Sequence, residues 1–270
     1  MTDTALETVL RRDRLVVASA LGALVALAWA YLLWLAADMD MGGMDMTDVR
    51  MIPAGLGIMM PASAPWKAIE FAFVFAMWAV MMVGMMAPSA APMILMYARV
   101  GRQGRAEGKS LAATGWFAAG YFVVWIGFSL AATTAQWGLE RTAMLDSQMA
   151  SVSTALGGTV LVLAGIYQWT PLKETCLRHC RSPLDFLLFH WREDGLGALK
   201  SGLGHGAYCL GCCWMLMALL FVGGVMNLAW IGAIALLVLI EKTLPWGGWM
   251  GRLVGVVLVL WGAATLAIAA

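Results

Sequence analysis

Charged side chains are scarce in this sequence of 270 residues, of which only 12% are Asp, Glu, Lys or Arg. A water-soluble domain carries about twice that share. Here 62% of the residues are hydrophobic and the mean hydropathy is +0.81. The composition therefore excludes an ordinary soluble domain and indicates an integral membrane protein. The net charge is only +1, so the chain lacks the basic excess expected of a nucleic-acid-binding protein.

Nucleotide-binding motifs are absent, and carboxylates are scarce inside the apolar segments. The first absence disfavours a process driven by ATP. The second disfavours a site for a hard cation such as magnesium, which prefers oxygen ligands. Glu70 and Glu241 are the exceptions, and both are expected near the membrane interface.

Cysteine and histidine are also rare, and all of them lie in residues 176–213. Thiolates and imidazoles are the ligands that suit zinc, copper(I) and iron–sulfur centres. We therefore expect a metal or redox site in this stretch, with His190 as a loop residue near the membrane interface. The candidate metal ligands are Cys176, His179, Cys180, His205, Cys209, Cys212 and Cys213.

The first half of this cluster has the pattern C-x2-H-C. In a helix, Cys176, His179 and Cys180 are spaced i, i+3 and i+4 and share one face. Arg178 and Arg181 favour the thiolate form. The alternative is a structural loop with ordinary reduced thiols.

The second half has the pattern H-x3-C-x2-C-C at the start of an apolar segment. In a helix, His205, Cys209 and Cys212 fall on a stripe about 60° wide, with Cys213 slightly aside. Cysteine often packs as a small hydrophobe, but a histidine at membrane depth is costly without a partner. Together the two halves predict a tetrahedral sulfur and nitrogen site between a cytoplasmic loop and this segment. Thiols in the cytoplasm are kept reduced, which argues against permanent disulfides.

Apolar segments predict an all-α, polytopic membrane bundle of about seven transmembrane helices that forms a single domain over residues 1–270. The segment that follows the arginines of residues 1–14 is read as an uncleaved span rather than a signal peptide. Pro88 and Pro92 predict a kink or break in the second span. The segment at 228–240 is short for a span. The seven segments are residues 15–37, 69–97, 111–135, 152–169, 203–226, 228–240 and 253–270.

Basic residues predict the orientation of the bundle. Of the 17 Lys and Arg residues, 14 lie in residues 1–14, 99–110, 171–200 and 241–252. Positively charged loops stay in the cytoplasm. The N-terminal tail and the Cys/His loop at 171–200 are therefore expected in the cytoplasm, with the C-terminus external. We expect a multi-pass protein of a bacterial cytoplasmic membrane.

Methionine forms a second pattern in the chain, which contains 21 methionines. The predicted external loop, residues 38–66, alternates Met with Asp, and its Gly and Pro residues disfavour regular structure. A second group follows one stripe of the second span. Thioethers select copper(I), although a helical Met stripe also suits packing, and the loop residues also suit disordered filler. The proposed metal path comprises Met39, Met41, Met44, Met46, Met77, Met81 and Met85.

Four motifs together resemble a known family. They are W-x2-MM-x2-MMAPSAAPM at 78–93, GIYQWTPLKETCLRHCRSP at 165–183, GLGHGAYCLGCCWMLM at 202–217 and EKTLPWG at 241–247. Over about residues 70–265 the chain is similar to a bacterial domain-of-unknown-function family described as predicted metal-binding integral membrane proteins. The resemblance implies that the seven Cys and His candidates match motif positions. It implies no established reaction.

The leading hypothesis is a membrane protein that binds a soft metal, in transport or in delivery to a partner. Copper(I) is expected first and zinc second, whereas haem and iron–sulfur centres are disfavoured. An enzyme is not favoured, although a membrane thiol/disulfide oxidoreductase remains an alternative. A structural subunit of a larger membrane complex is another. Beyond the lipid bilayer, the expected partners are a soluble metal chaperone or a membrane complex, and oligomerisation stays open.

Overall fold

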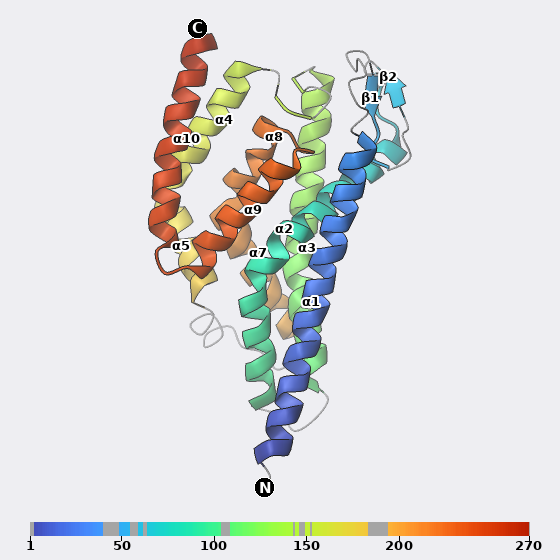
Figure 1. The fold of residues 1–270 in the computed structure, drawn as a ribbon, viewed down its shortest axis with the longest axis vertical. Coiled ribbons are helices and arrows are strands. Elements are labelled where there is room, and N and C mark those ends of the chain that lie inside the picture. Colours follow the sequence, from blue (N-terminus) through green and yellow to red (C-terminus); the bar gives the residue numbers. More distant parts are fainter. Residues whose placement is uncertain are drawn as a thin grey trace.

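The computed structural model is a helical bundle with one small sheet (Figure 1). The residues that it describes are 3–39, 49–54, 59–61, 64–103, 109–142, 144–145, 149–151, 153–182 and 194–269. The two ends of the chain lie at opposite ends of the bundle (Figure 1).

Among the described residues, five helices are long and apolar enough to cross a membrane. Long apolar runs form helices in a bilayer because a helix satisfies the backbone hydrogen bonds within the segment, where no water is available to do so. The predicted all-α membrane bundle is confirmed. The five are α1 (Asp3–Met39), α2 (Ala68–Gln103), α3 (Lys109–Arg141), α7 (Gly195–Ala218), which the short helix α8 (Leu220–Gly223) extends, and α10 (Gly247–Ala269).

The remaining helices are shorter, and here the structure differs from the seven predicted spans. Helix α4 (Thr154–Tyr167) and helix α5 (Pro171–Arg181) are bent by 63° and together make a candidate sixth span. Helix α9 (Leu228–Thr243) has 16 residues, which is about 24 Å of helix against a hydrocarbon core of about 30 Å. The described residues therefore contain five or six candidate spans.

The bend between α4 and α5 has a local cause in the sequence. Thr170 is the N-cap of α5, and its side chain accepts a hydrogen bond from the backbone N–H of Lys173 at 3.3 Å. Pro171 occupies the first helical turn, where its missing N–H breaks no helical hydrogen bond. A new helix therefore starts at this point, in a new direction.

Two other predictions about local structure are settled by the backbone. Helix α2 continues unbroken through Pro88 and Pro92, and it changes direction along its length (Figure 1). Within the predicted irregular loop at 38–66, strands β1 (Val49–Met51) and β2 (Met59–Pro61) pair antiparallel. The prediction of irregular structure was wrong for these two strands. Pro61 is the last residue of β2, so its missing N–H interrupts no hydrogen bond between the strands.

Close helix contacts hold α7 in place. A Cβ atom on Gly202 of α7 would collide with the carbonyl oxygen of Phe117 on α3, so only glycine permits this approach. Likewise, a Cβ on Gly165 of α4 would stand 2.6 Å from the carbonyl oxygen of Gly255 on α10. Small residues allow membrane helices to pack closely in this way. The packing fixes the cysteines of α7 against the aromatic side chains of α3.

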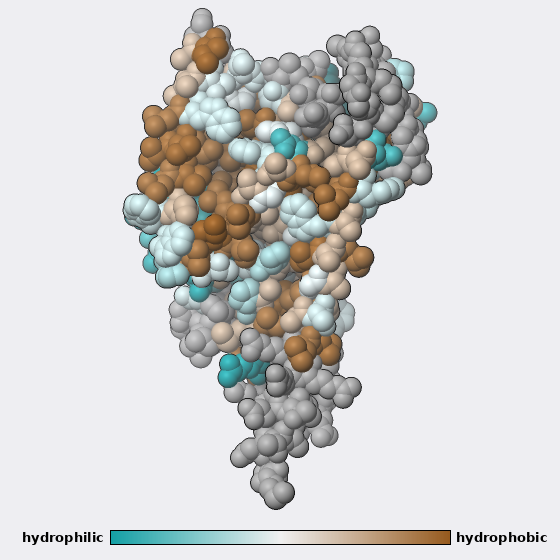
Figure 2. Space-filling model, in the orientation of Figure 1, coloured by the Kyte–Doolittle hydropathy of each residue, from teal (hydrophilic) through white to brown (hydrophobic). Residues whose placement is uncertain are grey.

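The outside of the bundle is apolar. Brown, hydrophobic residues cover much of the visible face over α9 and α10 (Figure 2). Leu27 and Leu260, for example, are 71% and 65% exposed. An apolar surface of this extent indicates contact with lipid rather than water. Polar side chains inside such a bundle therefore deserve a functional explanation.

Candidate functional site

Helix α7 buries the second half of the predicted ligand cluster. Cys209, Cys212 and Cys213 are each 1% exposed, and His205 lies one turn earlier on the same helix. The thiols of Cys212 and Cys213 both donate to the carbonyl oxygen of Cys209 at 3.0 Å. Three sulfur atoms thus gather within two turns of one helix, away from solvent.

Helix α5 adds two more thiols to this group. The Cys180 thiol lies beside the thiols of Cys209 and Cys212. Cys176 packs against Gly211 of α7, where an added Cβ would stand only 2.7 Å from its Sγ atom. All five cysteines are free thiols. The two halves of the cluster therefore meet through their sulfur atoms, although 28 residues lie between Cys180 and Cys209 in the sequence.

Gly211 is what allows the two helices to approach. Its carbonyl oxygen also accepts a hydrogen bond from the Tyr167 hydroxyl at 2.5 Å, which ties the end of α4 to α7. A side chain at position 211 would push the α5 thiols outward. The contact between α5 and α7 therefore depends on one small residue.

The histidines behave differently from the thiols. The Nδ1 atom of His179 lies 2.8 Å from the carbonyl oxygen of Thr175, and its ring stacks on Tyr208 with centroids 4.2 Å apart. The ring of His205 lies against the rings of Phe117 and Tyr121, at 6.0 and 5.7 Å. His190 falls outside the described residues.

The thiols do not make a closed metal site by themselves. Among the residues that the structure describes, no group of three or more His, Cys, Asp or Glu side chains is arranged to hold a metal ion. The tetrahedral sulfur and nitrogen site remains a prediction.

A buried cation that the sequence analysis missed faces these thiols. Lys242, which was expected in a loop, lies in the last turn of α9 and is only 8% exposed. Its Nζ atom donates to the Sγ atom of Cys209 at 2.9 Å and to the Oγ atom of Ser89 on α2 at 3.4 Å. A buried ammonium needs such partners, and it can compensate negative charge on sulfur. The only sequence signal was its place in the EKTLPWG motif.

Tyr121 of α3 completes the polar surroundings of Cys209. Its hydroxyl oxygen lies 3.0 Å from the Cys209 Sγ atom and 3.3 Å from the carbonyl oxygen of Met86 on α2. Side chains from α3, α7 and α9 thus converge on one sulfur atom. Cys209 is the centre of the candidate site.

The methionine stripe of α2 lies in the same core. Met77, Met81 and Met85 are buried and belong to one apolar cluster with Cys209. Tyr121 connects the two through its contact with Met86. Of the loop methionines, Met39 ends α1 and its side chain is not described, and Met41, Met44 and Met46 fall outside the described residues.

Next to Lys242, Glu241 anchors α5 to α9. This carboxylate, which the sequence places near the membrane interface, is buried within the protein and accepts hydrogen bonds from Lys173 Nζ at 2.8 and 2.9 Å. The two side chains are 2% and 3% exposed, and Gln168 accepts a third hydrogen bond from Lys173. Because Lys173 lies two turns before Cys180, this pair holds the α5 thiol against α7.

Comparison with known proteins identifies the family of this chain. No curated protein and no solved structure matches the chain. A family match extends over residues 75–265, nearly the range that carried the resemblance found in the sequence, and it contains the thiols, Lys242 and the Lys173–Glu241 pair. The family is described as a copper chaperone. The chain therefore belongs to the PpoB2 copper chaperone family.

Proposed function

We propose that this protein binds copper(I) inside a bacterial cytoplasmic membrane and passes the ion to an acceptor by exchange of sulfur ligands. The proposed ligands are the thiolates of Cys209 and Cys212, with the Cys180 thiol beside them. One observation carries the proposal: the α5 thiol meets two α7 thiols in the buried core, directly beside the ammonium of Lys242. Thiolates are soft ligands that select copper(I).

The charge of the site supports copper(I) over zinc. Two thiolates and one copper(I) ion carry a net charge of minus one, which the ammonium of Lys242 neutralises. Zinc on the same two thiolates would leave the buried group with a net positive charge. An uncompensated charge inside a membrane protein is costly. Zinc also prefers four ligands in a tetrahedron, and the described side chains offer no such set.

The buried methionines provide a route to the thiols. Met77, Met81 and Met85 follow one side of α2 and share the apolar core with Cys209. Thioethers are neutral ligands, so an ion that leaves them for thiolates gains an electrostatic attraction. The Met/Asp loop before β1 would serve as the external capture region, and a soluble chaperone or a membrane complex as the acceptor.

Metal analysis of the full-length protein tests this proposal. The protein is purified without chelators, loaded with copper(I) under reducing conditions and assayed by elemental analysis. Cys209→Ser and Cys212→Ser are expected to lose most of the bound copper. His179→Gln is the matched control and should retain it, because that ring stacks on Tyr208. Unchanged copper content in both Ser variants would reject the proposed ligands.

Thiol trapping distinguishes the proposed copper(I) binding from the main alternative, a thiol oxidoreductase. A membrane thiol oxidoreductase would form a reversible disulfide, for instance between Cys180 and Cys212, during its working cycle. Mass spectrometry of alkylated protein detects this bond. A disulfide that cycles in active protein with no bound copper would favour the oxidoreductase.

A further inference from the structure

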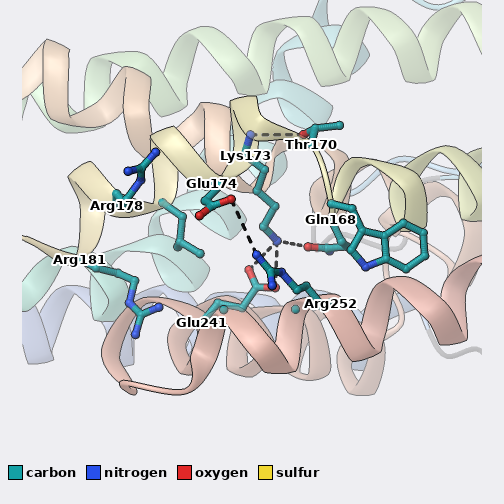
Figure 3. Close-up of a pocket in the computed structure, with 12 residues that line it drawn as sticks. Gln168, Thr170, Lys173, Glu174, Arg178, Arg181, Glu241 and Arg252 are labelled. Atoms are coloured by element: carbon teal, nitrogen blue, oxygen red, sulfur yellow. Dashed lines mark hydrogen bonds and ion pairs between the residues drawn. The ribbon is translucent and has the colours of Figure 1, made fainter.

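A second polar feature lies outside the thiol site, where α5 meets the turn between α9 and α10, at the left of Figure 1 and about halfway down. It is a cavity of about 140 Å³. Figure 3 shows Lys173 extending into it between Gln168 and Glu241, with Arg252 beside them and Arg178 and Arg181 to one side. The lining residues with charged side chains are Lys173, Glu174, Arg178, Arg181, Glu241 and Arg252.

The charges of this cavity do not balance. Four basic side chains face two carboxylates, and Lys173 and Glu241 neutralise each other at 2.8 Å. Arg252 reaches Glu174 only at 3.8 Å, and both side chains are about 60% exposed, so this pair is weak. Arg181 donates to the carbonyl oxygens of Leu244 and Pro245, at 2.5 and 2.7 Å, and these carry no charge.

Arg178 and Arg181 therefore keep their positive charge within the described part of the chain. No ion pair of either with a described carboxylate is present. The cavity holds an excess of two positive charges beside a partly open rim. This arrangement suits an anion with several oxygen atoms, because guanidinium groups bind phosphate in a bidentate manner.

Exposed aromatic side chains place the cavity at the surface of the membrane. Trp169 lines it at 45% exposure, and Trp246 and Trp249, at the start of α10, are 50% and 65% exposed. Tryptophan concentrates at the level of the lipid headgroups. Leu172, which begins the outer face of α5, is 60% exposed and extends the apolar surface next to the rim. A molecule with a phosphate and an acyl chain matches both parts.

We infer that this cavity binds the phosphate of an anionic phospholipid headgroup. Basic pockets between helices on the cytoplasmic side of membrane proteins suit this class of ligand. Arg178 and Arg252 contact the phosphate, and the apolar surface beside the rim receives the start of the acyl chains. The inference does not depend on copper binding, since it uses none of the sulfur ligands.

Lipid titration of the full-length protein in neutral detergent tests this site. Phosphatidylglycerol is added, and retained lipid is counted by native mass spectrometry. Arg178→Gln with Arg252→Gln is expected to weaken binding about thirtyfold, since each basic residue contributes about a factor of five. Arg99→Gln, an exposed basic residue at the end of α2, is the matched control and should change binding little.

Two further arms keep the test decisive. Arg178→Lys with Arg252→Lys preserves the charge but not the bidentate contact, and should bind more tightly than the Gln double variant and less tightly than the wild-type protein, which separates a local effect from misfolding. Phosphatidylcholine and inorganic phosphate should bind much more weakly than phosphatidylglycerol. Equal binding of inorganic phosphate would overturn the lipid assignment, and equal binding of phosphatidylglycerol by the Gln double variant would overturn the site.

Discussion

Replacing Lys242 by Met tests the charge balance of the proposed copper site. Met has a similar length and no charge, so the change removes the ammonium 2.9 Å from the Cys209 sulfur with little loss of volume. A copper(I) dithiolate would then be left with an uncompensated negative charge in the buried core. We therefore expect Lys242→Met to weaken copper(I) binding.

The structure gives the size of this effect. With the positive charge about 4 Å from the centre of the copper and sulfur group, the attraction is about 4 kcal/mol at an effective dielectric constant of about 20. Part of this lost attraction is offset, because the metal-free variant no longer buries an ammonium group. A net loss of about 2–4 kcal/mol remains, and the dissociation constant for copper(I) should rise by about 30-fold to 1,000-fold.

Competition with a chromophoric copper(I) chelator, in detergent and without oxygen, measures this constant. Lys242→Arg keeps the charge and should lie much closer to the wild-type protein. Zinc should respond in the opposite direction, because zinc on two thiolates is neutral without the ammonium. Copper(I) and zinc affinities that both stay unchanged in Lys242→Met would refute the charge argument.

Three further predictions concern the surroundings of the site. Tyr121→Phe removes the hydroxyl contact with the Cys209 thiol and should weaken copper(I) binding about fivefold in the same competition assay, corresponding to about 1 kcal/mol. An unchanged dissociation constant would show that the hydroxyl does not contribute. Lys173→Met leaves the carboxylate of Glu241 buried and unpaired, and should lower the free energy of unfolding by about 3–5 kcal/mol. Adding Glu241→Leu to this variant should recover most of that loss. Unfolding in denaturant measures both variants, and equal values for the single and double variants would contradict the pairing. Gly211→Ala should push α5 away from α7 and reduce copper retention, whereas Gly127→Ala, where an added Cβ meets nothing within 4 Å, should not.

Much of the bundle was predictable from hydropathy alone. Long apolar runs became α1, α2, α3, α7 and α10, because a chain in lipid has few other ways to satisfy its backbone. Helix ends were less predictable. Pro171 starts a new helix and Asn227 caps α9, where its side chain accepts a hydrogen bond from the N–H of Trp230 at 3.1 Å. Such local caps fix the residue at which each helix begins.

The candidate site was predictable in its thiols and not in its other groups. Helical spacing placed Cys176 and Cys180 on one face, and both reach α7. The same spacing put His179 with them, but its ring stacks on Tyr208, a partner from another helix that spacing cannot reveal. Lys242 and Glu241 looked like loop charges because they end an apolar run. Their burial depends on partners 33 and 68 residues away in the chain.

Helix α9, which is too short for a full membrane span, carries the Lys242 ammonium that faces the thiols of the candidate site. Glu241 and Lys242 end an apolar segment, where the sequence suggests solvated side chains. Instead, the last turn of α9 is buried in the bundle. Consecutive residues then point in different directions, so Glu241 binds Lys173 of α5 while Lys242 binds Cys209 of α7. One turn of a short helix therefore both anchors α5 and its thiols beside the site and supplies the cation that the proposed copper(I) dithiolate requires.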